Sequence, residues 1–218
     1  MHDEDMASEA SEFWARRREF DSSPGGDGSG DVGRQLVLLA DVVDDAVRPA
    51  HDRIAGELDD FDCLTPSPFE TLHLTIKLFN VPAEATDVDD PAVNRIGEAI
   101  SGVVEDTSPF EVTFTRFNLF PDVVYAEVDA AGRLDAMNRR LCAQPEIAEL
   151  DRDAEGFIPH LTLGYFTNST DYHALVTSLE TDREVPLPGL TVDELALVAY
   201  EVGSGWPSTY DRLETYEL

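Results

Sequence analysis

The stretches LHLTI at residues 72–76 and PHLTL at residues 159–163 repeat one pattern, a His-x-Thr motif inside an apolar, β-prone run. Side chains two residues apart on a strand project from the same face of a sheet. Each motif therefore presents one imidazole and one hydroxyl together, while its other side chains belong to a core. Two such strands side by side would bring four polar groups into one cleft: His73, Thr75, His160 and Thr162.

Two imidazoles and two hydroxyls are a set of groups that can cleave a 2′,3′-cyclic phosphate. One imidazole takes a proton from water and the other gives a proton to the leaving ribose oxygen, because the unperturbed pKa of His is about 6.5. The Thr hydroxyls donate hydrogen bonds to the non-bridging oxygens as charge builds there. This chemistry predicts a bell-shaped pH–rate profile and requires neither a metal nor another cofactor. The residues do not say which His is the acid.

Lys77, the only lysine of the chain, lies four residues after His73. Strict alternation along the strand places it on the face of His73 and Thr75, where its ammonium would bind phosphate. The alternative is a lysine at the rim of the site whose position is accidental. The remaining histidines have no partner motif and are assigned to the surface or to packing: His2, His51 and His173.

The 218-residue chain carries 45 acidic and 15 basic residues, which gives a formal net charge of −30. Asp and Glu are spread along the whole sequence, so the charge belongs to the entire surface and not to one tail. Concentrated salt screens such self-repulsion, because the Debye length falls to about 3 Å at 1 M. The composition resembles that of proteins from halophilic archaea. The alternative is an acidic protein that binds basic partners, but such a protein would concentrate its negative charge in one region.

Cys63 and Cys142 lack the paired spacing of a metal site and are expected to be free thiols in a reducing compartment. No apolar run reaches the roughly 18 residues of a membrane span. The acidic N-terminus does not resemble a signal peptide. We therefore expect a cytoplasmic, monomeric protein with no metal, no cofactor and no membrane association.

Residues 1–33 are predicted to form an acidic, flexible tail, and residues 34–218 the folded domain. Gly, Ser, Pro and Asp make up residues 22–30, which cannot build a core. The glycines at 28, 30 and 33 match a G-x-G-x-x-G pattern, but they follow a linker and precede a strand, which argues against a dinucleotide site. Upstream, FWARRR at residues 13–18 is a basic and aromatic island that either frays as a helical tail or docks on the domain or a partner.

Hydrophobic periodicity predicts alternating strands and helices over the folded part. The predicted strands span residues 35–40, 72–79, 110–117, 123–128, 157–166, 192–200 and 210–216, and the predicted helices about residues 43–58, 90–103, 134–141 and 169–179. Each motif strand follows a strand–helix unit and precedes a helix and further strands, an approximate internal duplication. This order predicts an α+β fold of two pseudo-symmetric lobes of antiparallel sheet, with helices packed outside and a central cleft.

Over about residues 34–218 the sequence resembles the 2H phosphoesterase superfamily, in particular its 2′-5′ RNA ligase (LigT-like) and RNA 2′,3′-cyclic phosphodiesterase group. The resemblance rests on the two His-x-Thr motifs, with weaker support from FP at 120–121, VVYA at 123–126 and the last two strands. It implies the two-lobed 2H fold, the two motif histidines as acid and base, and the two threonines on the phosphate. The implied partner is an RNA 3′ end or a nucleotide cyclic phosphate.

Many members of this family carry an Arg just after the Phe-Pro turn, where this chain has Asp122 and Val123. Contacts to the base and ribose are therefore assigned by position alone to Arg116, Tyr165 and Phe166. Counterion release contributes little to RNA binding in molar salt. Hydrogen bonds and base stacking must then recognise a small substrate.

Three functions stay open from the sequence. The first is hydrolysis of a 2′,3′-cyclic phosphate to a 2′-phosphate in RNA processing, or its reversal with an RNA 5′-hydroxyl, which forms a 2′-5′ linkage. The second is a non-catalytic protein that binds RNA ends or nucleotides. The third is a phosphodiesterase that acts on another small cyclic phosphate.

Overall fold

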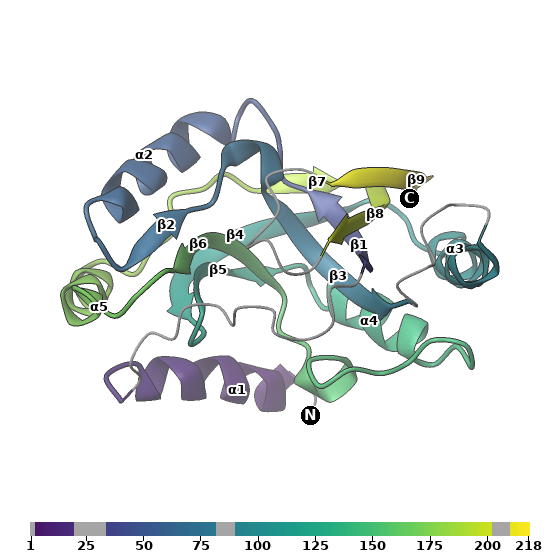
Figure 1. Ribbon diagram of the computed structural model, residues 1–218, viewed down its shortest axis with the longest axis horizontal. Coiled ribbons are helices and arrows are strands. Elements are labelled where there is room, and N and C mark those ends of the chain that lie inside the picture. Colours follow the sequence, from purple (N-terminus) through teal and green to yellow (C-terminus); the bar gives the residue numbers. More distant parts are fainter. Residues whose placement is uncertain (1–2, 20–33, 82–89, 202–209) are drawn as a thin grey trace.

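The computed structural model describes residues 3–19, 34–81, 90–201 and 210–218 (Figure 1). Nine strands of these segments form one antiparallel sheet in the order β7-β4-β5-β6-β3-β1-β8-β9, and β2 pairs with β6 beside this path. The strands are β1 (Arg34–Asp41), β2 (Leu64–Pro66), β3 (His73–Asn80), β4 (Phe110–Leu119), β5 (Val123–Asp129), β6 (His160–Phe166), β7 (Leu190–Val192), β8 (Glu194–Glu201) and β9 (Asp211–Glu217).

Five α-helices accompany the sheet: α1 (Asp3–Arg16), α2 (Arg48–Asp59), α3 (Pro91–Val104), α4 (Arg133–Cys142) and α5 (Tyr172–Thr181). Helix α3 begins as the sequence predicts. The Asp90 side chain accepts a hydrogen bond from the Ala92 amide at 2.7 Å, and Pro91 occupies the first turn. The α+β antiparallel fold is therefore confirmed.

One face of the sheet packs against helices α2 to α5 and forms the main hydrophobic core. Each of these helices contributes an apolar stripe, and strand residues such as Leu74, Ile76 and Leu161 fill the space beneath them. The opposite face of the sheet carries two smaller apolar clusters. The first contains Val37 and Leu39 of β1 with Ala196 and Val198 of β8, and the second contains Phe120, Val123 and Tyr125.

The connection between β7 and β8 differs from the prediction of a single strand over residues 192–200. Strand β7 pairs with β4 at one end of the sheet, whereas β8 pairs with β1 and β9 near the other end. The chain therefore changes partners at Asp193, between the two strands. A local apolar pattern does not reveal such an exchange, because both segments are equally β-prone.

Helix α1 and the residues that follow it pack against the domain. The Ala10 carbonyl accepts a hydrogen bond from Asn118 Nδ2 at 2.9 Å, and the Phe13 ring meets Phe120 edge to face at 5.1 Å. Arg17 and Arg18 both pair with Glu180 at the end of α5. The basic and aromatic island at residues 13–18 thus docks on the domain. The boundary of the domain at residue 34 stays a prediction, and residues 20–33 lie outside the described part.

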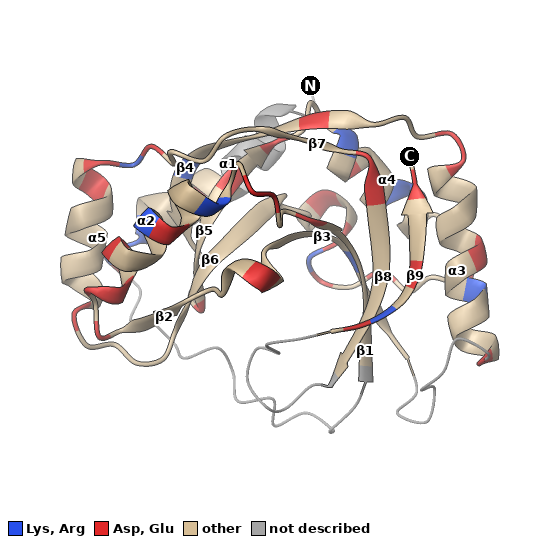
Figure 2. Ribbon diagram, turned by 90° about the horizontal axis from the view of Figure 1, so that it is seen from above, with Lys and Arg blue, Asp and Glu red and all other residues tan. Residues whose placement is uncertain are grey.

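Asp and Glu residues are spread over the helices and loops of the ribbon, as Figure 2 shows. This distribution agrees with a whole-surface charge; adaptation to salt stays a prediction. Both cysteines are free thiols, as expected. None of the helices in the described segments is long and apolar enough to cross a bilayer.

Candidate active site

The two His-x-Thr motifs meet at the centre of the sheet, where β3 and β6 pair antiparallel at Leu74 and Leu161. These two leucines face the main core. The antiparallel register, continued by one residue on each side, sets His73 opposite Thr162 and Thr75 opposite His160. Side chains directly opposite each other share a face and lie about 5 Å apart at their Cβ atoms. Each motif therefore places its imidazole beside the hydroxyl of the other.

A β-bulge in β3 changes the direction of Lys77. Leu38 of β1 pairs with Lys77, but the next residue, Leu39, pairs with Thr75, so Ile76 is the extra residue. The bulge interrupts strict alternation and turns Lys77 to the core face. Its ammonium, on a residue that is 1% exposed, pairs with Asp153 and donates to the Ala148 carbonyl at 2.9 Å. The prediction that Lys77 faces the phosphate is therefore wrong.

A second β-bulge lies at the same distance beyond the second motif. Val124 of β5 pairs with Gly164, but Tyr125 pairs with Thr162, so Leu163 is the extra residue of β6. The bulge brings Tyr165 to the face of His160 and Thr162, and the Tyr165 hydroxyl hydrogen-bonds with the Thr162 side chain. Burial raises the pKa of the Tyr165 phenol, which stays protonated as a hydrogen-bond donor.

The same bulge turns Phe166 to the core face. Phe166 is 2% exposed and lies 5.4 Å from the Tyr172 ring of α5. The prediction that it contacts the substrate is therefore wrong. Arg116 is exposed, and its guanidinium pairs with Glu127 through Nε at 3.1 Å and Nη2 at 3.0 Å. A substrate contact by Arg116 stays a prediction.

The His73 ring is held by its own backbone. Nδ1 lies 2.7 Å from the Thr71 carbonyl and 2.8 Å from the Tyr210 hydroxyl, which itself donates to that carbonyl at 2.7 Å. A carbonyl can only accept, so Nδ1 carries the proton of the neutral ring and Nε2 is its unprotonated nitrogen. Tyr210 also packs edge to face on the ring, with centroids 5.6 Å apart.

The His160 ring repeats this arrangement. Nδ1 lies 2.8 Å from the Ile158 carbonyl, again two residues earlier, so Nε2 is the unprotonated nitrogen of the neutral ring here too. Aromatic rings surround it: Phe120 meets the imidazole edge to face at 5.2 Å, and Tyr125 does so at 5.3 Å. Two proton-transfer groups with one tautomer are thus built by the same local geometry.

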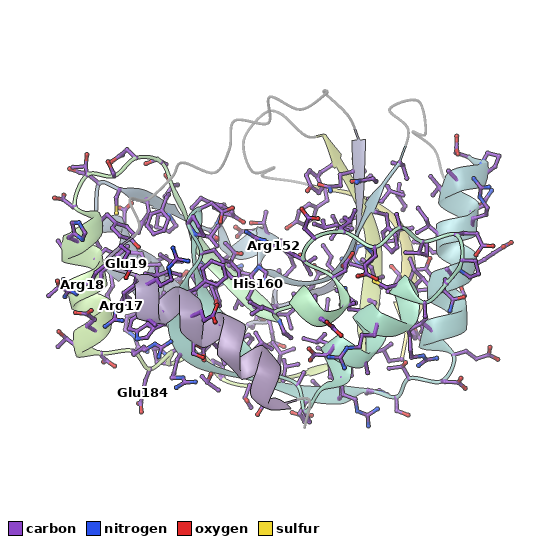
Figure 3. The ribbon with its side chains drawn as sticks, turned by 90° about the horizontal axis from the view of Figure 1, so that it is seen from below. Arg17, Arg18, Glu19, Arg152, His160 and Glu184 are labelled. Carbon is purple, nitrogen blue, oxygen red and sulfur yellow. The ribbon has the colours of Figure 1, made fainter. Side chains whose placement is uncertain are left out.

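Burial sets the charge state of both histidines. It lowers the pKa of His160 to about 4, and the positive charge of Arg152 acts in the same direction, as does that of His73 whenever His73 is protonated. Burial also lowers the pKa of His73, while the Thr71 carbonyl and the carboxylate of Asp41 oppose that shift. Both rings are therefore neutral in the free protein near pH 7. Figure 3 shows Arg152 on the same side of the molecule as His160.

The other described histidines lie elsewhere. His51 is buried in α2, where Nε2 lies 3.0 Å from the Ser67 carbonyl and the ring packs on Phe69. His173 lies in α5. Within the described segments no three His, Cys, Asp or Glu side chains gather into a possible metal site.

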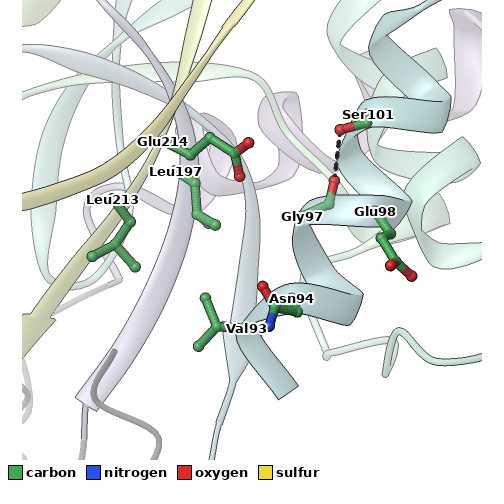
Figure 4. Close-up of a pocket in the computed structure, with 8 residues that line it drawn as sticks. All are labelled: Val93, Asn94, Gly97, Glu98, Ser101, Leu197, Leu213 and Glu214. Carbon is green, nitrogen blue, oxygen red and sulfur yellow. Dashed lines mark hydrogen bonds between the residues drawn. The ribbon is translucent and has the colours of Figure 1, made fainter. Parts of the chain in front are cut away.

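A cavity of about 710 Å³ lies away from the histidines, between α3 and strands β8 and β9 (Figure 4). Its lining has two carboxylates and no basic group, so it offers nothing to a phosphate: Val93, Asn94, Gly97, Glu98, Ser101, Leu197, Leu213 and Glu214. The chemistry described above therefore resides on the sheet face and not in this cavity.

A family model of the 2′-5′ RNA ligase superfamily matches residues 44–204, a span that includes both motifs and most of the sheet. The chain belongs to this superfamily. The 2H phosphoesterase resemblance is thereby confirmed. A curated relative, the RNA 2′,3′-cyclic phosphodiesterase of Methanothermobacter thermautotrophicus, is 24% identical over 190 residues, which cover 84% of this chain and 98% of the relative.

Solved structures share the fold of this chain. A protein of Thermus thermophilus matches with a TM-score of 0.59 and 22% identity, over 84% of this chain and 97% of its own. E. coli LigT, in a complex with 3′-AMP, matches with a TM-score of 0.59 and 17% identity, over 85% and 98% of the two chains. At these identities the likeness concerns the fold.

Three features of the site were not predicted from the sequence. Tyr210 and Tyr125 flank the imidazoles, and Arg152 lies near His160. Tyr210 lies 137 residues from His73 in the chain, and Arg152 lies in the loop before β6, outside the strand pattern of the second motif, so strand alternation links neither to the histidines. Gly164 did carry a signal, because an isolated Gly in a strand often marks a bulge or a close backbone approach. A Cβ there would lie 2.9 Å from Leu64 Cδ1.

Proposed function

We propose that this protein hydrolyses the 2′,3′-cyclic phosphate of an RNA 3′ end or a nucleotide to a 2′-phosphate, without a metal. The observation that supports it most is the pair of imidazoles with matched geometry. Each donates Nδ1–H to a carbonyl two residues earlier, so Nε2 is the unprotonated nitrogen that can exchange a proton with the substrate. Membership in the 2′-5′ RNA ligase superfamily and the activity named for the Methanothermobacter relative support the same chemistry.

We assign His160 as the base and His73 as the acid. Burial lowers the pKa of both imidazoles; the charge of Arg152 lowers that of His160 further, whereas the carboxylate of Asp41 opposes the shift at His73 and favours its protonated form. Nε2 of His160 takes a proton from water as its oxygen forms a bond to phosphorus. The bond from phosphorus to the ribose 3′-oxygen breaks, and Nε2–H of His73 gives that oxygen its proton. Exchange with solvent then restores both rings.

Thr75 and Thr162 donate hydrogen bonds to the non-bridging oxygens, whose negative charge grows in the transition state. Tyr165 extends this set as a donor next to Thr162. With an RNA 5′-hydroxyl in place of water, the same groups open the cyclic phosphate in the same way: the 5′-oxygen bonds to phosphorus, the 3′-oxygen leaves, and a 2′-5′ linkage forms. We place hydrolysis first because water is always present at high concentration.

The test is turnover of a nucleoside 2′,3′-cyclic phosphate by the pure protein in molar KCl with EDTA, beside His73→Ala and His160→Ala. We expect turnover in the wild-type protein that EDTA does not reduce, and loss of about 10²–10⁴-fold in each variant. Folding of both variants is checked by circular dichroism.

Folded wild-type protein that turns over no cyclic phosphate in a nucleotide panel would favour a binding protein instead. Turnover that EDTA abolishes, and that survives both substitutions, would contradict the two-histidine mechanism. Activity on other cyclic phosphates alone would move the substrate away from RNA ends.

A further inference from the structure

The guanidinium of Arg152 lies beside the site, and the proposed mechanism gives it no contact with the substrate. It is exposed in the loop between α4 and β6, and its guanidinium lies over the Phe120 ring at 4.8 Å from the centroid. The same ring contacts His160 at 5.2 Å. One aromatic side chain thus lies against both the guanidinium and the imidazole.

Several arginines of the described residues pair with a carboxylate, whereas Arg152 does not. Neighbouring arginines in the structure are neutralised: Arg17 and Arg18 by Glu180, and Arg116 and Arg183 by Glu127. Among the described residues no carboxylate pairs with Arg152. With 45 acidic residues in the chain, a guanidinium left without one is available to an anionic ligand.

The loop that carries Arg152 is fixed by its buried neighbour, Asp153. This carboxylate pairs with Lys77 and accepts hydrogen bonds from Asn138 Nδ2 at 2.9 Å and from the Leu150 amide at 2.7 Å. Asn138 also donates to the Ile76 carbonyl at 2.8 Å. Ile76 is the bulged residue of β3, so the network joins the loop directly to the first motif strand.

We propose that Arg152 binds the phosphate of the substrate and that Lys77 is a positioning residue that fixes the Arg152 loop through Asp153. This proposal rests on the proposed function, because it assigns a ligand for the same phosphodiester. The bulge that turns Lys77 away from the substrate places its ammonium under the loop. The charge at the phosphate then comes from a guanidinium, whose planar fork of donors matches two phosphate oxygens.

The direct test compares Arg152→Gln and Arg152→Lys with Arg53→Gln, a matched control with the same change of charge on the exposed surface of α2. A cyclic phosphodiester carries one negative charge and gains more in the transition state, so the contact strengthens during reaction. We expect kcat/KM for a nucleoside 2′,3′-cyclic phosphate to fall about 100-fold in Arg152→Gln. Arg152→Lys recovers part of this loss and Arg53→Gln keeps wild-type activity.

Values of kcat/KM within threefold of the wild type in Arg152→Gln would overturn the proposal, as would an equal loss in Arg53→Gln. A measurement without turnover separates this proposal from the proposed function. Binding of a nucleoside 2′-monophosphate by calorimetry should weaken at least tenfold in Arg152→Gln, whether or not the wild type cleaves a cyclic phosphate. Unchanged binding would refute the Arg152 contact.

Lys77→Met tests the positioning role, with NMR titration of the His160 imidazole as the readout. Removal of the Arg152 charge should raise the pKa of His160 in Arg152→Gln, because that charge helps to lower it. In Lys77→Met the displaced loop should raise the pKa of His160 by the same amount. Adding Arg152→Gln to Lys77→Met should then lower kcat/KM little further. A folded Lys77→Met protein with the wild-type His160 titration would refute the positioning role. If Lys77→Met does not fold, Lys77→Arg gives the same readout, with partial displacement expected and a wild-type titration again refuting the role.

Discussion

The His73 half and the His160 half of the site start from the same local design and end in different surroundings. Both rings donate Nδ1–H to the carbonyl two residues earlier, and both strands carry a bulge three residues after the His. His73, however, lies beside the Tyr210 hydroxyl and near Asp41, whereas His160 lies among aromatic rings near Arg152. The motif sets the tautomer and the direction of each imidazole ring, and the surrounding side chains set the protonation state of the ring.

The two bulges both reverse the faces of the side chains that follow them, with opposite results for the site. After the first motif, the bulge turns the polar side chain of Lys77 from the face of the site to the core face. After the second motif, the bulge turns the polar side chain of Tyr165 to the face of the site and the Phe166 ring to the core face. A pseudo-symmetric fold can thus keep its backbone plan while its two halves take on different tasks.

The largest expected effect separates the two histidines by pH. In the free enzyme the active form has a neutral His160 and a protonated His73, so kcat/KM should peak on the acidic side, between about pH 4 and pH 6.5. His160→Gln should lose about 10²–10⁴-fold in activity together with the acidic limb of the profile, and His73→Gln a similar factor together with the alkaline limb. An optimum above pH 7, or exchanged limbs, would break the assignment.

Lys77→Met should cost about 3–5 kcal/mol in the free energy of unfolding, because it leaves the Asp153 carboxylate buried without its cation. Urea denaturation in molar KCl measures this difference. The double variant Lys77→Met with Asp153→Asn should recover part of the loss. A cost below about 1 kcal/mol would mean that the pair is far less buried than its position on the core face indicates.

The neutral His160 should make stability depend on pH. The unfolded chain binds the imidazole proton with an ordinary pKa of about 6.5, and the folded protein does so only near pH 4. The stability that the neutral ring confers is therefore complete above pH 6.5 and falls as the pH drops from 6.5 to 4, by up to about 3 kcal/mol. The difference in unfolding free energy between wild type and His160→Gln, measured across this range, isolates the term from the titration of carboxylates. A difference in unfolding free energy that does not vary with pH would contradict the predicted contribution of the neutral His160 ring.

The smallest expected effects come from residues that each belong to one half. Tyr210→Phe removes a hydroxyl next to His73, so it should shift the alkaline limb of the kcat/KM profile and cost about 1 kcal/mol of stability. Phe13→Ala removes an aromatic contact behind Phe120 at a similar cost, and the alkaline limb should stay in place. A shift of that limb in Phe13→Ala would show that the halves are coupled more strongly than their contacts suggest.

The sequence alone predicted much of this protein for reasons that are local. Alternation within two short strands put each His with its Thr, and apolar periodicity located helices α2 to α5 and most strands. It did not locate helix α1, which lies in the residues predicted to form a flexible tail. It did not predict the short strand β2 or the exchange of partners at Asp193, which depend on distant pairing. The docking of residues 13–18 was one of two options from the sequence, and the contacts of Phe13 and Arg17 with distant elements selected it.

What the sequence determined by itself is therefore the inventory of the site: two imidazoles and two hydroxyls on strands that a fold with paired lobes brings together. What only the tertiary structure decided is which other side chains join them. The bulges at Ile76 and Leu163 arise from the register against β1 and β5, and an extra residue in one strand reverses every side chain beyond it. Lys77 was placed wrongly for this reason, since alternation is a rule of a single strand and register is a property of two. Phe166 was assigned by position alone, and the second bulge turns it to the core face.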